Sequence, residues 1–76
     1  MKARLLDWSE LHEGLVIWEE WKNGDGTSRG VVRMVKDKYA ILQRGMVSTL
    51  IVKGETWIRY WDAEPTAEQR EATPWA

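Results

Sequence analysis

Apolar and polar residues alternate along most of the chain in short runs that end at glycine-containing or charged turns. Five runs are rich in β-branched and aromatic residues: 15–21, 29–36, 39–44, 46–52 and 57–61. Such composition and spacing are typical of strands. The pattern therefore predicts a meander of five antiparallel strands over 15–61. A flat sheet of this size would leave one face exposed to solvent and two strand edges unpaired. Curling into a small barrel buries that face and pairs the edges.

The segment before the first strand has the signals of a short helical turn over 7–13. Asp7 or Ser9 can act as its N-cap, and Gly14 is a suitable end because glycine tolerates positive φ. We therefore expect a single helical turn ahead of the meander.

The segment after the last strand predicts a helix over 66–73. Thr66 and Gln69 have the spacing of a capping box. Only two alanines inside the helix are apolar, so the helix has no core of its own. We expect it to lie on the sheet, anchored by Trp75.

The composition indicates one small domain spanning 1–76. The chain has six Trp, no Phe and no Cys, so it has neither a disulfide nor a thiolate zinc site. His12 is the only histidine, and we expect no metal or cofactor. A buried Trp removes roughly 200 Å² from water, so indoles are expected to supply much of the core. No apolar run is long enough for a signal peptide or membrane span, which predicts a soluble, cytoplasmic protein without a membrane partner.

Charge is unevenly distributed, although the formal net charge is only −1. Residues 1–21 have two basic and five acidic side chains, and residues 62–76 have one and four. Residues 22–61 have eight basic and three acidic side chains. The chain therefore has acidic ends and a basic middle.

Two stretches of the sequence resemble known proteins. The capped turn followed by "EGLVIWEEW" and short-looped strands resembles the opening of a Src-homology-3-like small barrel. The closing "WIRYWDAEPTAEQREATPW" is similar in layout to small uncharacterised proteins of bacteriophage and mobile elements in Gram-positive bacteria. In those, an aromatic-rich last strand runs into a P-T-x-E-x-R helix. The resemblance implies a mainly β, five-stranded antiparallel Src-homology-3-like small barrel with a short N-terminal turn and a C-terminal helix. It implies no catalytic residue.

The residues that could support catalysis are few. Ser9 and His12 lie three apart on one turn, but only generic carboxylates are available to orient the histidine. Glu19 and Glu20 are adjacent in a strand and therefore point to opposite faces, so they cannot act together on one substrate. The sequence predicts a protein that is not an enzyme.

Aromatic residues of the last strand form the first candidate binding surface. Trp57, Arg59 and Trp61 share one face of this strand, and a Trp-Arg-Trp row has the composition of a protein-binding hot spot. The alternative is that the C-terminal helix and Trp75 fold back and cover this face. In the first strand, one of Trp18 and Trp21 should be in the core and the other nearer solvent, which makes both candidates for the same surface.

Basic residues of the middle form the second candidate surface: Arg33, Lys36, Lys38 and Arg44. Basic side chains interleaved with aromatics on a small barrel suit single-stranded nucleic acid. The alternative is that the acidic tail neutralises this basic face, in keeping with the sequence pI of about 5.8.

The sequence thus favours a non-catalytic module that binds a protein partner through tryptophan and arginine. The phage-like resemblance implies an inhibitor or regulator of a host protein. The alternative is binding of RNA or single-stranded DNA. Self-association is a third route if the edge of the last strand, 57–61, is uncovered.

Overall fold

The structure is a computed structural model that describes residues 2–75. Its elements, in chain order, are the 3-10 helix η1 (Trp8–Glu10), strands β1 (Val16–Trp21), β2 (Thr27–Val35), β3 (Tyr39–Arg44), β4 (Val47–Val52) and β5 (Ile58–Trp61), and helix α1 (Ala67–Ala72). The prediction of a mainly β chain with five antiparallel strands and one short C-terminal helix is confirmed.

Two elements differ from the prediction by more than one residue at an end, and the other differences are of one residue. β2 begins at Thr27, two residues earlier than expected, because Thr27 pairs with Glu20 of β1. The helical turn expected over 7–13 is limited to η1, since Leu11 already has extended backbone (ψ 133°). This change of direction buries the Leu11 side chain in the core.

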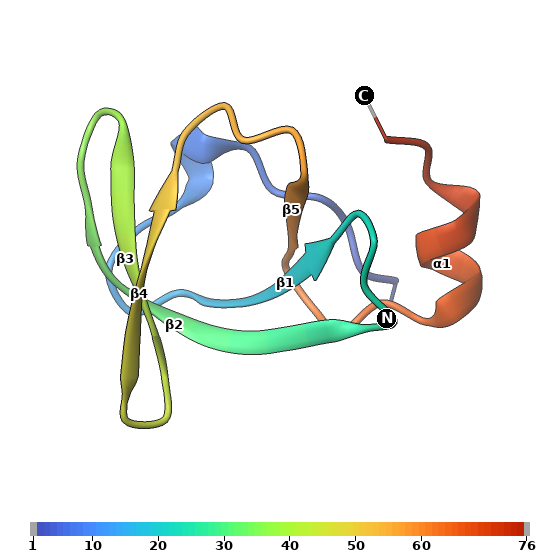
Figure 1. Cartoon of the computed structure of the whole chain (residues 1–76), viewed down its shortest axis with the longest axis horizontal. Helices are drawn as coiled ribbons and strands as arrows, with labels where there is room; N and C mark the ends of the chain where they lie inside the picture. The colour runs from blue at the N-terminus through green and yellow to red at the C-terminus, as the bar shows by residue number, and fades with distance from the viewer. Residues whose placement is uncertain (1, 76) are drawn as a thin grey trace.

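The five strands form one sheet in the order β4-β3-β2-β1-β5, and every neighbouring pair is antiparallel. The first four strands pair with their sequence neighbours, whereas β5 returns to the free side of β1 (Figure 1). The sheet therefore ends with β4 on one side and β5 on the other.

The free edge of β5 is covered by residues 4–6. The Leu6 N–H donates to the Tyr60 carbonyl at 2.8 Å, and the Asp62 N–H donates to the Arg4 carbonyl at 3.0 Å. An isolated antiparallel bridge joins Leu5 to Trp61 between these two bonds. The N-terminal segment therefore occupies the outward backbone groups at the Tyr60–Asp62 end of the last strand, which is not an open edge there.

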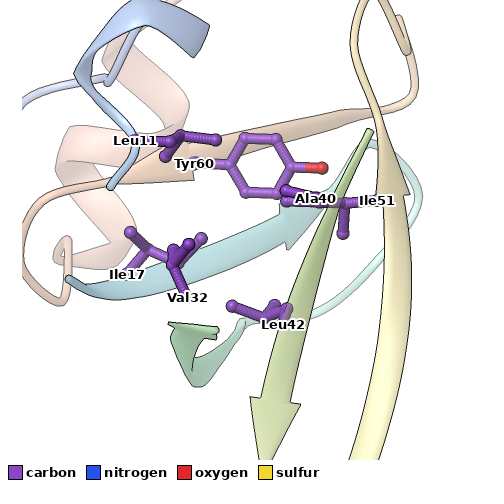
Figure 2. Packing of buried hydrophobic residues seen from close by; sticks show 7 residues of the cluster. All are labelled: Leu11, Ile17, Val32, Ala40, Leu42, Ile51 and Tyr60. Atoms are coloured by element: carbon purple, nitrogen blue, oxygen red, sulfur yellow. The ribbon is translucent and has the colours of Figure 1, made fainter. Parts of the chain in front are cut away.

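The core lies on the concave face of the curled sheet. It consists of one tyrosine and six aliphatic residues: Leu11, Ile17, Val32, Ala40, Leu42, Ile51 and Tyr60. Figure 2 shows the Tyr60 side chain extending from β5 toward Ala40 and Ile51. The cluster contains no tryptophan, although Trp8 packs at its margin. Indoles supply less of the core than expected, because each of the first four strands places an aliphatic side chain in this cluster and the buried Trp61 lies outside it.

Helix α1 lies beyond β1 and β5, on the side away from the β3–β4 hairpin (Figure 1). Its first turn has the predicted capping box: the Gln69 N–H donates to Thr66 Oγ1 at 3.1 Å, and the Thr66 N–H donates to Gln69 Oε1 at 3.0 Å. None of its six residues is buried. The helix therefore depends on side chains of the sheet to hold it in place.

Candidate binding surfaces

The outer face of β1 and β5 contains a buried polar cluster beneath the C-terminal segment. The register places Glu20 opposite Arg59 and Trp18 opposite Trp61, so these four side chains share one face. Arg59 Nε donates to Glu20 Oε1 at 2.7 Å, and Trp61 Nε1 donates to the same oxygen at 2.8 Å. One carboxylate thus satisfies both the arginine and the indole.

The Arg59 guanidinium also holds the end of α1. Its Nη1 donates to the Thr73 carbonyl at 2.7 Å and its Nη2 to the Arg70 carbonyl at 2.9 Å. These carbonyls belong to the last helical turn and the residue that follows it, where acceptors lack partners within the helix. The guanidinium centre lies 4.3 Å from the Trp75 ring centroid and 5.2 Å from that of Trp61. Arg59 therefore connects the sheet to α1 and to the residues that follow α1, Thr73 to Trp75.

This arrangement corrects the predicted Trp-Arg-Trp row. Arg59 is 9% exposed and Trp61 is 2% exposed, so neither forms an open binding surface. The alternative, that the C-terminal segment and Trp75 cover this face, is what the structure shows. Trp57 is the member that remains accessible, because it precedes β5 and lies beyond the covered part of the strand.

The two most exposed indoles come from the same end of the β1–β5 pair, Trp21 from the face of Glu19 and Trp57 from the face of Arg59. Trp21 is 51% exposed at the end of β1, and Trp57 is 53% exposed just before β5. The Lys22 N–H donates to the Trp57 carbonyl at 2.8 Å, and Lys22 Nζ lies 5.5 Å from the Trp57 ring centroid. Trp21 Nε1 donates to Glu19 Oε1 at 3.1 Å. We call Trp21, Lys22 and Trp57 the tryptophan end.

Trp18 differs from the expectation for the first strand. Trp21 is nearer solvent, as one of the two was expected to be, but Trp18 is not in the core. It is half-buried on the outer face of β1, opposite Trp61. Trp18 thus belongs with the covered cluster rather than with the tryptophan end.

A second polar cluster, formed by residues of β1, β3, β4 and β5, lies on the core side of the sheet. Glu19 is almost fully buried and forms an ion pair with Arg44. Arg44 Nη1 also donates to Thr49 Oγ1 at 3.1 Å. Within the described residues, Glu19 Oε2, Arg44 Nε and Tyr60 Oη have no hydrogen-bond partner. Burial, together with the negative charge of Glu19, raises the pKa of Tyr60 well above its usual range.

A groove of about 850 Å³ lies between η1 and the ends of the strands near the β2–β3 turn. Its lining includes two aromatic and three basic side chains among nine residues: Trp8, Ser9, Leu11, Val35, Lys36, Asp37, Lys38, Tyr39 and Lys53. Trp8 Nε1 donates to the Lys36 carbonyl at 3.3 Å, which fixes one wall. Lys38 and Lys53 come together because the Lys53 N–H donates to the Lys38 carbonyl at 2.9 Å. We call this the basic groove.

The predicted basic set is therefore divided. Lys36 and Lys38 line the basic groove, whereas Arg44 is committed to Glu19 and Arg33 donates from Nε to Gln43 Oε1 at 2.5 Å. The four residues therefore do not form one surface, because Arg44 lies at the far end of β3 and the Arg33 side chain bonds to Gln43. Sequence reasoning missed Lys53, whose position opposite Lys38 follows from the Tyr39–Val52 register.

The residues considered for catalysis are not assembled. His12 Nδ1 lies 3.1 Å from the Glu13 carbonyl, and among the described residues it has no hydrogen bond to Ser9. Glu19 and Glu20 point to opposite faces, as predicted, since one meets Arg44 and the other meets Arg59. Among residues 2–75, no group of three or more His, Cys, Asp or Glu is placed to hold a metal ion.

Comparisons with protein-family models, with curated proteins and with solved structures give no match. In the part of the chain that the structure describes, no helix has the length and apolar character needed to cross a membrane. The tryptophan end and the basic groove are therefore the features on which a functional proposal rests.

Proposed function

We propose that this chain is a non-catalytic binding domain that docks a protein partner through the tryptophan end. The observation that carries the proposal is that Trp21 and Trp57 are both about half exposed and yet held in place. Glu19 anchors the Trp21 indole, and the Lys22 ammonium lies over the Trp57 ring. Trp dominates protein-binding hot spots because it offers a large contact area at a small cost in conformational entropy.

The resemblance noted in the sequence adds a fold family and a setting to this proposal. A five-stranded antiparallel sheet whose last strand returns to the first is compatible with a Src-homology-3-like small barrel. The phage and mobile-element resemblance suggests an inhibitor or regulator of a host protein. A cytoplasmic location fits a chain without cysteine.

Affinity capture with matched variants tests the proposal. The wild-type chain, Trp21→Ala, Trp57→Ala and the control Met46→Ala are immobilised and exposed to the same host lysate. We expect a protein that wild type and Met46→Ala retain and that both tryptophan variants fail to retain. Binding of that purified protein should depend only weakly on salt, because indole burial dominates. Equal retention by all four chains would contradict the proposal.

A second candidate function, binding of RNA or single-stranded DNA, is favoured by the basic groove. Trp8 and Tyr39 offer ring faces for bases, and Lys36, Lys38 and Lys53 offer positive charge for phosphates. The formal net charge of −1 opposes general attraction to nucleic acid, so any such binding depends on this local cluster.

Titration with a labelled oligonucleotide at several salt concentrations tests the second candidate. We expect each of Lys38→Glu and Lys53→Glu to weaken binding and to lower the salt slope by roughly 0.7 for each phosphate that is no longer neutralised. The control Arg33→Glu lies outside the groove and should change binding little. Absence of a salt-dependent complex with wild type would remove this candidate.

A further inference from the structure

Strand β4 is the open edge of the sheet. Residues 4–6 cover the edge of β5, but β4 pairs only with β3 in the part of the chain that the structure describes. Figure 1 shows the β3–β4 hairpin extending away from the remaining strands, with its turn at one extreme of the molecule. A strand edge in this position is accessible to another chain.

The backbone groups that face this edge follow from the hairpin register. The Lys53 N–H donates to Lys38, so Lys53 is in a hydrogen-bonded pair with β3. Hydrogen-bonded and non-hydrogen-bonded pairs alternate along an antiparallel ladder. Ser48, Leu50 and Val52 therefore direct their N–H and C=O groups away from β3. None of their N–H groups bonds to another backbone group within residues 2–75, whereas the Val52 carbonyl already accepts the Glu55 N–H at 3.4 Å.

The same segment lacks the usual protection of an edge strand. Residues 46–52 contain no charged residue and no proline, the features with which natural edge strands prevent pairing. Four of the eight large apolar side chains exposed in the described residues belong to this segment: Met46, Val47, Leu50 and Val52. Leu50 and Val52 are at least half exposed, at 56% and 50%.

We propose that β4 pairs with β4 of a second copy of this chain, antiparallel and with a two-fold axis at Leu50. Leu50 of one copy then lies beside Leu50 of the other, and Ser48 lies opposite Val52. These pairs exchange the backbone hydrogen bonds that the edge offers. Lys53 falls opposite Val47, so no charge of this segment faces a like charge. The interface is isologous and closes as a dimer.

The proposed register also matches the projecting turn to a hollow. It brings Met46, which is fully exposed at the tip of the hairpin, next to the Gly54 turn of the other copy. Gly54 borders a hollow of about 260 Å³ whose wall includes Leu5, Leu6 and Ile58. The apolar tip and this hollow, whose wall also includes the charged residues Asp7, Glu55 and Arg59, lie at opposite ends of one strand and meet under a two-fold axis.

The exposed area is consistent with a small dimer interface. A monomer of 8.9 kDa exposes on average about 4,800 Å². This chain exposes 5340 Å². The chain therefore exposes roughly 500 Å² more than an average monomer of its mass, and an isologous contact between two copies would bury part of its exposed surface.

Sedimentation equilibrium of the purified chain tests this proposal. We expect a mass that rises from one to two chains with concentration for wild type. Leu50→Lys places two ammonium groups at the axis and should abolish the dimer. The control Met34→Lys changes an exposed apolar side chain of β2, away from the edge, and should leave the dimer intact. Thermal unfolding verifies that both variants fold. A wild-type chain that remains monomeric at its highest attainable concentration overturns the proposal.

Cysteine cross-linking supplies a test that does not depend on a charged variant. The wild-type chain has no cysteine, so a single introduced thiol links only to its counterpart in another copy. Mild oxidation should convert Leu50→Cys to a covalent dimer, because residue 50 meets itself at the axis within disulfide reach. The matched control Ser48→Cys faces Val52 instead and should remain unlinked. Equal linkage of both variants, or of neither, overturns this interface.

Discussion

Gly30 of β2 packs directly against the side chain of Leu42 in β3. A Cβ atom at position 30 would lie 2.7 Å from Leu42 Cγ and 2.9 Å from its Cδ1. Leu42 is fully buried in the core, so its side chain is enclosed by neighbours. The absence of a side chain at Gly30 is therefore what allows Leu42 to fill the centre of the sheet.

Gly30→Ala is accordingly expected to lower the free energy of unfolding by about 1–3 kcal/mol, the usual cost of overpacking a core. Urea denaturation measures the change. Gly26→Ala is the matched control, since a Cβ there would meet nothing within 4 Å. Similar stability of the two variants would mean that Leu42 repacks freely.

Arg59→Met is expected to be the most destabilising change on the outer face of the sheet. It leaves the Glu20 carboxylate buried without its cation and frees the carbonyls of Arg70 and Thr73. Removal of one partner of a buried ion pair typically costs about 3–5 kcal/mol. Chemical denaturation gives the free energy, and a red shift of tryptophan emission reports exposure of Trp61.

The control for this variant is Arg4→Met. Arg4 forms ion pairs with Glu10 and Asp62, but its side chain is largely exposed, so water can take the place of those partners. We expect a much smaller decrease in stability than for Arg59→Met. Comparable decreases would show that burial of the Glu20–Arg59 pair is not the deciding factor.

Tyr60 is expected to make the fold sensitive to alkaline pH. Burial raises the pKa of its hydroxyl in the folded chain, so the unfolded chain releases this proton first. The contribution of Tyr60 is complete below the unfolded pKa of about 10 and is lost as pH rises above it. Denaturation of wild type and Tyr60→Phe at several pH values should show the fall in stability for wild type and a weaker fall for the variant.

The same variant tests the unpartnered hydroxyl at neutral pH. Tyr60 Oη is buried without a hydrogen bond in the described residues, so its removal exposes no acceptor or donor. We expect Tyr60→Phe to be neutral or to stabilise the fold by up to about 1 kcal/mol. A clear decrease in stability would indicate that the hydroxyl has a partner in solution.

Glu10 is expected to contribute to stability only above strongly acidic pH. Its hydrogen bond and ion pair with Arg4 lower the pKa of its carboxyl to about 2. The contribution is therefore present above the unfolded value of 4.5 and is lost as pH falls through about 2. NMR titration of the Glu10 carboxyl measures the midpoint directly. High salt should raise this midpoint, because both side chains are at the surface.

The local features of this fold were predictable from the sequence. Alternation of apolar residues located the strands, and the spacing of Thr66 and Gln69 located the start of α1. Each depends on side chains only a few residues apart, whose geometry follows from the repeat of the backbone. The opposite directions of Glu19 and Glu20 were predictable for the same reason.

Contacts between distant residues were not predictable in the same way. The strand period places Trp57, Arg59 and Trp61 on one face. It does not show that the carbonyls of Arg70 and Thr73 accept hydrogen bonds from Arg59, or that the C-terminal segment covers that face. The pattern predicts that Arg44 is a cation at the surface. It does not indicate the ion pair with Glu19, because Glu19 lies 25 residues away in the sequence. Both errors concern basic side chains, which the composition alone assigns to solvent.

The sheet order also has a consequence for the kinetics of folding. β1 to β4 pair with sequence neighbours and require only short loop closures, which occur on the microsecond scale. β5 instead pairs with β1, and their ion pair joins Glu20 to Arg59 across 39 residues. Closing this long loop costs more chain entropy before any contact forms. We therefore expect the hairpins to form first and closure of the β1–β5 loop to be the rate-limiting step. Because the Arg59 bonds form after this closure, substitutions at Arg59 should mainly accelerate unfolding.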